Sequence, residues 1–196
     1  MRAVVPLRVG VYVFDGADEL DVVGTFSVLA RWAAHAAVKA EVVTFCDDGS
    51  GVVLASGLRI VPDAGEPDVD SLHVLVYPGG PGTRDKIVDQ AHLEWLRTRR
   101  GTTPLVLGLR DGTLVLAAAG LLAGRAVTCN ADLLDLLSRT DPSALVDTEA
   151  LLVDDGDILT AVGDGASIDA ALHVVARLDS DQAAAAVRSA LRSGYP

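Results

Sequence analysis

The sequence is poor in aromatic residues and in basic side chains. Its 196 residues include 3 Phe, 2 Trp and 3 Tyr, so the core must be built mainly from Val, Leu and Ala. Lys and Arg number 16 against 27 Asp and Glu, which gives a net charge of −11. A surface this acidic repels phosphate backbones, and a basic membrane-binding helix is missing too. We therefore expect neither a nucleic-acid nor a membrane partner.

Cysteine is also scarce, and the two present are not arranged for metal binding. Cys46 and Cys129 are far apart, and the four histidines form no ligand cluster with them. Two scattered thiols are typical of reduced cysteines in a cytoplasmic protein. Cys129 follows an apolar stretch and has no adjacent histidine to activate it, which favours a small buried hydrophobe. We expect a cytoplasmic protein without metal or cofactor.

Apolar runs alternate with helical patterns along the chain. Half of the residues are apolar, and there are no repeats or linkers, which indicates a single domain over residues 1–196. Alternating strands and helices indicate a mostly parallel sheet with helices on both faces. Strands are expected at 8–14, 38–46, 73–77, 105–109, 126–129, 151–153 and 158–162, with a hairpin at 52–60. Helices are expected at 19–37, 85–99, 113–122, 131–139, 168–178 and 182–193.

In such sheets a ligand binds beyond the carboxyl ends of the strands. Four segments of this chain should reach that edge: 15–21, 78–83, 110–112 and 161–165. Asp18 and Glu19 are best explained as caps of the first helix, where carboxylates complement the helix dipole. Asp21 lies further in, between apolar neighbours, and should be half-buried and in need of a partner. Residues 78–83 (PGGPGT) offer bare backbone amides that could bind an oxyanion or simply form a tight turn.

Arg110, Asp111 and Gly112 connect an apolar strand to an Ala- and Leu-rich helix. Sharp strand-to-helix turns of this kind often carry a nucleophile, a role that arginine cannot fill. Three interpretations remain open. Arg110 could pair with Asp111 or Asp21, or it could grip an anion together with the helix N-terminus. Alternatively, Asp111 and Asp21 could form a carboxylate pair for acid–base work.

Four segments together resemble the ThiJ/PfpI superfamily, in particular the branch of isonitrile hydratase and the amidotransferase-like domains of some transcription regulators. The resemblance extends from about residue 9 to 178, and it implies a flavodoxin-like three-layer sandwich that usually forms a homodimer. In the first segment Thr25 replaces the family's proline. The segments are LDVVG (20–24), YPGGPGT (77–83), GTLVLAAAGLLAGRAVT (112–128) and DDGDILTAVGDGASIDAALHVV (154–175).

The resemblance also implies an active site. The family has a cysteine on the elbow between strand and helix, an acidic residue on the first helix and backbone amides in the Gly-Gly turn. The acid corresponds to Asp21, and the amides correspond to Gly79 and Gly80. The cysteine corresponds to Arg110, so thiolate addition cannot occur at that position.

Further residues of this implied site would contact a ligand. Gly112 is the first residue of the segment 112–116, which aligns with the family without gaps. Asp111 corresponds to the small polar residue after the family's cysteine. The histidine that often follows the elbow helix corresponds to Cys129, with Asn130 beside it. These residues complete the expected binding site for a small molecule.

Two functions are compatible with this site. In the first, Asp21, Arg110 and Asp111 catalyse a hydratase- or lyase-type reaction on a small molecule without a cysteine nucleophile. In the second, the protein is a catalytically inactive, regulatory or ligand-sensing relative in which an Arg110–Asp21 salt bridge replaces the active site. A regulator with its own DNA contacts is disfavoured by the charge and by the end at Pro196, which leaves no room for a helix-turn-helix domain.

Overall fold

The core of the fold is a seven-stranded sheet. The computed structural model describes residues 6–69, 71–163 and 165–193. All neighbouring strands of the sheet are parallel except the β10–β11 pair, which is antiparallel. This confirms the mostly parallel α/β sheet. The strand order is β10 (Leu152–Asp154), β11 (Ile158–Ala161), β7 (Leu105–Leu109), β6 (Val74–Tyr77), β1 (Leu7–Tyr12), β2 (Ala40–Cys46) and β5 (Ala64–Gly65).

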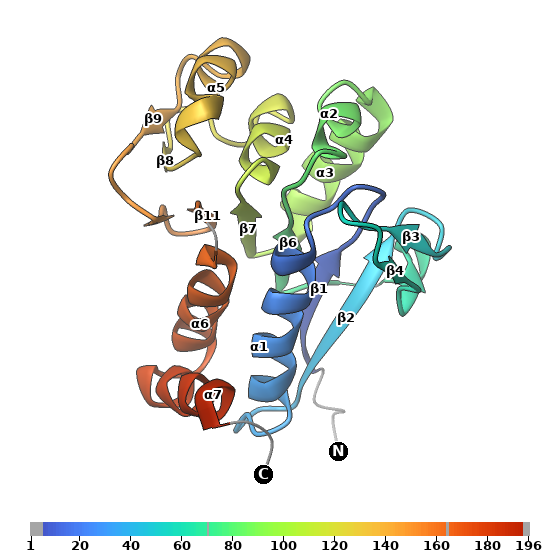
Figure 1. The fold of residues 1–196 in the computed structure, drawn as a ribbon, viewed down its shortest axis with the longest axis vertical. Helices are drawn as coiled ribbons and strands as arrows, with labels where there is room; N and C mark the ends of the chain where they lie inside the picture. Colours follow the sequence, from blue (N-terminus) through green and yellow to red (C-terminus); the bar gives the residue numbers. More distant parts are fainter. Residues whose placement is uncertain (1–5, 70, 164, 194–196) are drawn as a thin grey trace.

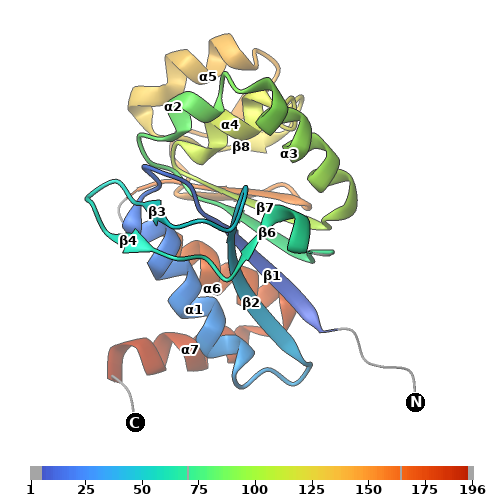
Figure 2. The same ribbon diagram turned by 90° about the vertical axis from the view of Figure 1, so that its right-hand side faces the viewer.

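Helices cover both faces of the sheet, so the three-layer arrangement is confirmed (Figures 1 and 2). No helix of the described residues is both long and apolar enough to cross a membrane. The first face carries α1 (Thr25–Ala33), α6 (Ala166–Leu178) and α7 (Asp181–Ser193). The second carries α2 (Thr83–Lys86), α3 (Gln90–Thr102), α4 (Gly112–Ala118) and α5 (Leu134–Thr140). Short turns are η1, a π-helical turn (Leu20–Gly24), and the 3-10 turns η2 (Glu66–Asp68) and η3 (Ala131–Leu133).

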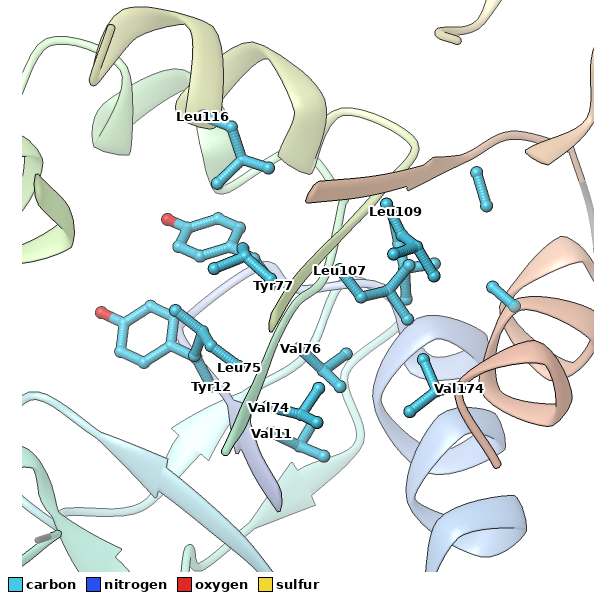
Figure 3. Close-up of a cluster of buried hydrophobic side chains, with 14 of the residues drawn as sticks. Val11, Tyr12, Val74, Leu75, Val76, Tyr77, Leu107, Leu109, Leu116 and Val174 are labelled. Atoms are coloured by element: carbon cyan, nitrogen blue, oxygen red, sulfur yellow. The ribbon is translucent and has the colours of Figure 1, made fainter. Parts of the chain in front are cut away.

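The central strands are buried on both sides, as continuous apolar runs require. Figure 3 shows Val76 on the side of Val174 in α6, whereas Tyr12 and Tyr77 lie on the side of Leu116 in α4. All five side chains are fully buried. The sheet is therefore a rigid platform whose carboxyl edge presents the loops after β1, β6, β7 and β11.

Four expected helices differ from the structure. Those expected over 19–37 and 131–139 begin as the short turns η1 and η3 and continue as α1, which ends at Ala33, and as α5. The helix expected over 85–99 is divided into α2 and α3, because the side chain of Asp89 accepts hydrogen bonds from the amides of Ala91 and His92 and so starts a new helix. The helix expected over 113–122 ends at Ala118, and Gly120 follows with a φ of +74°. Glycine in that left-handed conformation commonly ends a helix.

Some strand assignments also differ. The stretch expected at 126–129 forms only β8 (Ala126–Val127), which pairs with β9 (Leu145–Val146) outside the main sheet. The hairpin at 52–60 is present as β3 (Val52–Val53) and β4 (Arg59–Ile60). Within the expected edge segment 161–165, Asp164 lies outside the described residues.

Candidate functional site

The turn between β7 and α4 holds Arg110 in a strained conformation. Its φ is +49°, and no other non-glycine residue of the described chain has a positive φ. Holding a non-glycine residue in the left-handed backbone conformation costs about 1–3 kcal/mol, which the surrounding structure must offset. The Arg110 amide donates to the carbonyl of Ala161 (2.8 Å), and its own carbonyl accepts from Thr113 (3.1 Å). The elbow geometry expected for a nucleophile is thus present with an arginine on it.

The Gly-Gly turn after β6 packs directly against this elbow. A Cβ on Gly79 would lie 2.9 Å from both the amide nitrogen of Asp111 and the carbonyl oxygen of Leu109. A Cβ on Gly112 would lie 2.7 Å from the carbonyl oxygen of Tyr77. Contacts this close require glycine at both positions. The backbone amides of the turn are consequently held beside Arg110 and the first residues of α4.

Asp21 is the buried acid of the site. It lies in the π-helical turn η1, is 1% exposed, and accepts a hydrogen bond from the Gly79 amide at 2.9 Å. Burial is the largest effect and raises the pKa of Asp21 to about 6, although the hydrogen bond from Gly79 lowers it. Of the two charged neighbours, the Asp18 carboxylate raises this pKa and the Arg110 guanidinium lowers it. A carboxyl group with this pKa can both donate and accept a proton near neutral pH. π-Helical turns are frequent at functional sites.

The pairing of Arg110 with Asp21 or Asp111, which is one of the three interpretations that the sequence leaves open, is wrong. The Arg110 guanidinium instead pairs with Asp18, with 3.1 Å between Nη1 and Oδ2. Asp21 faces the Gly79 amide, whereas Asp18 keeps about a fifth of its side chain exposed and costs less to bring against a cation. Asp18 also accepts from the amides of Leu20 and Asp21, so its capping role is confirmed.

Glu19 does not cap the helix through its side chain. Its carboxylate accepts a hydrogen bond from the amide of Ser56, at the tip of the β3–β4 hairpin, with a distance of 2.6 Å. The hairpin is thereby fastened to the start of η1, next to the site.

Asp111 completes the group around the elbow. It precedes α4, is half-buried, and its pKa is raised by burial, against the lowering effects of Arg110 and of the Gly80 backbone. Asp21, Gly79, Gly80, Arg110, Asp111 and Gly112 therefore meet at one edge of the sheet, as the sequence predicts.

Cys129 and Asn130 are less closely attached to this group. Cys129 is buried, and burial, with a smaller contribution from Asp132, raises its pKa to about 11, so its thiol stays protonated at neutral pH. Within the described chain, neither residue makes a hydrogen bond to Asp21 or Arg110. Their role in contacting a ligand stays a prediction.

Sequence reasoning missed Asp18 as the partner of Arg110. The available signal was its spacing, because Asp18 and Asp21 are three residues apart at the start of one helical segment. A helical turn can place such residues on the same side.

Comparison with known proteins identifies the family. A sequence model of the DJ-1/PfpI family matches residues 7–177. The chain belongs to the DJ-1/PfpI family. Isonitrile hydratase from Pseudomonas putida is 30% identical over 172 residues, which are 88% of this chain and 72% of that enzyme.

Other family members include transcription regulators. The regulator CdhR from Pseudomonas aeruginosa is 34% identical over 143 residues, which are 71% of this chain but only 41% of CdhR. Among solved structures, a ThiJ/PfpI family protein from Pseudomonas syringae superposes with a TM-score of 0.84 at 28% identity, covering 98% of this chain and 78% of that one. The family therefore contains enzymes and regulators on the same fold.

Proposed function

We propose that this protein is a cysteine-independent hydratase of a small molecule, with Asp21 as its general acid and base. The observation that carries the proposal is the state of Asp21: a buried carboxyl with a pKa of about 6, which accepts one backbone hydrogen bond and is not ion-paired with Arg110. An ion pair with Arg110 would favour the ionised form of Asp21 and hold its pKa low. Arg110 pairs with the more exposed Asp18 instead and leaves Asp21 able to exchange protons.

Isonitriles are the substrate class suggested by the similarity to isonitrile hydratase. Protonated Asp21 transfers its proton to the terminal carbon of R–N≡C, and a water oxygen bonds to the same carbon. The water then returns a proton to the Asp21 carboxylate, which leaves R–N=CH–OH, and this tautomerises to the formamide R–NH–CHO. The sum is addition of one water, with no covalent enzyme intermediate.

Arg110 and Asp111 have supporting roles in this scheme. The guanidinium of Arg110, fixed at the elbow, orients the attacking water or the oxygen of the product. Asp111, whose pKa is also raised, is a second proton acceptor at the same edge. The Gly79 amide donates to Asp21 and the Gly80 backbone to Asp111, so the Gly-Gly turn orients both acids.

A cysteine-free variant tests whether a thiol takes part. We expect the Cys46→Ala, Cys129→Ala double variant to hydrate an alkyl isonitrile with kcat/KM within about threefold of the parent, because the scheme has no thiolate nucleophile. Formation of the N-alkylformamide is followed by proton NMR, and circular dichroism verifies the fold. Loss of turnover in a folded double variant would contradict the proposal.

The similarity to CdhR supports a second candidate, a ligand-sensing function. The same site would then bind the small molecule without converting it. Calorimetric titration with the alkyl isonitrile distinguishes the two: heat of binding without formamide production indicates a sensor.

We also propose that the chain forms a homodimer through an apolar patch beside the site. Leu20, Val23 and Ile168 are 53%, 46% and 36% exposed, and η1 packs on α6 at this point. The Leu20→Asp, Val23→Asp double variant is expected to be monomeric in size-exclusion chromatography with light scattering. Val88→Asp, at a site that is 71% exposed and distant in sequence, is the control and should leave the dimer intact. A monomeric parent protein would contradict the homodimer proposal.

A further inference from the structure

A buried hydroxyl lies next to the segment that carries Asp21. Ser167, in the first turn of α6, is 2% exposed, and its Oγ has no hydrogen bond of normal geometry within the described chain. Buried polar side chains nearly always have a partner, and an exception calls for an explanation.

Packing of α6 against η1 brings this hydroxyl close to the turn that carries Asp21. Gly24 lies three residues after Asp21 in the same π-helical turn, and a Cβ on Gly24 would be 4.0 Å from Ser167 Oγ and 3.4 Å from Ile168 Cγ1. The first turn of α6 therefore lies within van der Waals reach of the turn that carries the acid. Figure 1 shows α6 lying alongside α1, which continues directly from that turn.

We propose that Ser167 is a positioning residue for Asp21, whose hydroxyl donates a hydrogen bond to the ionised carboxylate. This bond fixes the orientation of the carboxyl group between the Gly79 amide and the elbow. Four groups then act on Asp21: the Gly79 amide, the Asp18 carboxylate, the Arg110 guanidinium and the Ser167 hydroxyl. The last of these lowers the pKa of Asp21, against the effect of burial. Only the catalytic consequence rests on the proposed hydratase function.

Titration of Asp21 by carboxyl-carbon NMR tests the contact directly. Ser167→Ala removes the donor, and the pKa of Asp21 is expected to rise by about one unit, because a hydrogen bond to the charged form is lost. Ser167→Gly removes the same hydroxyl and should give the same shift. Thr103→Val is the matched control: Thr103 is 1% exposed, its hydroxyl is also unpartnered, and it follows α3, so the pKa of Asp21 should not change. An unchanged pKa in both Ser167 variants overturns the proposal.

The pH profile of turnover separates this inference from the hydratase function. A general acid must be protonated, so kcat for the alkyl isonitrile should fall as the pH rises through the pKa of Asp21. In Ser167→Ala this fall should move to higher pH by the same amount as the NMR titration. If the parent protein produces no formamide, the hydratase proposal fails, while the NMR shift still decides the role of Ser167.

Discussion

Replacement of Asp21 by Asn is expected to lower kcat for isonitrile hydration by about 10²–10⁴-fold, the usual contribution of a positioned acid–base group. The Asn amide oxygen can still accept the Gly79 hydrogen bond, so the π-helical turn should be kept. The amide cannot give up a proton to the substrate carbon. Turnover is measured at pH 6, where both protonation states of the Asp21 carboxyl are populated.

Asp18→Asn is the matched control for this variant. Asn caps helices as well as Asp does, and the change also removes a charge from the same segment. Because the Asp18 carboxylate raises the pKa of Asp21, the control should move the pH profile downward without abolishing turnover. Equal losses in the two variants would show that the charge of the segment matters and that Asp21 is not the proton donor.

Asp21→Asn should also change the pH dependence of stability. The folded pKa of about 6 lies above the ordinary value of 3.8, so the folded state holds this proton more tightly than the unfolded state. The resulting stabilisation is complete below about pH 4 and is lost as the pH rises through 6, by at most about 3 kcal/mol. The variant should therefore melt at a higher temperature than the parent at pH 8 and at a similar temperature at pH 4. A variant that is less stable at every pH would indicate that the carboxylate is structural.

The sheet was predictable from the sequence because its central strands are short apolar runs. The strand expected at 105–109 coincides with β7, since Pro104 and Arg110 bound an uninterrupted apolar run. The expected helix at 85–99 failed where Asp89 supplies a cap inside a helical pattern. Aspartate is a common N-cap residue, but the apolar spacing on either side of Asp89 is compatible with one continuous helix.

The sequence predicts which residues lie at the site, but not which carboxylate forms the ion pair with Arg110. The carboxyl ends of parallel strands meet at one edge, so Asp21, Gly79 and Arg110 had to be near one another. The partner of Arg110 depends on the direction in which a left-handed residue projects its side chain, and on which carboxylate keeps contact with water. The two-residue pairing of β8 with β9 likewise depends on contacts between distant segments.

Gly80→Ala is expected to be among the most destabilising single substitutions in the site, by about 3–5 kcal/mol, from backbone strain and overpacking together. Gly80 has a φ of +115°, and a Cβ there would lie 2.4 Å from the carbonyl oxygen of Gly16 and 2.6 Å from the amide nitrogen of Asp18. Both atoms belong to the backbone, so no side-chain rotation can relieve the contact. Urea unfolding at neutral pH measures the loss.

Gly57→Ala separates the two causes. Gly57, at the tip of the β3–β4 hairpin, has a φ of +96° with no atom within 4 Å of its Cβ position, so the variant should lose only about 1–2 kcal/mol from the left-handed conformation. The difference between the variants therefore measures how tightly the Gly-Gly turn is held against the 16–18 loop. Because the same turn presents the Gly79 amide to Asp21, folded Gly80→Ala protein should also lose turnover. Equal destabilisation by the two substitutions would mean that the turn can move away from this loop, and the geometry around Asp21 would then not be fixed by packing.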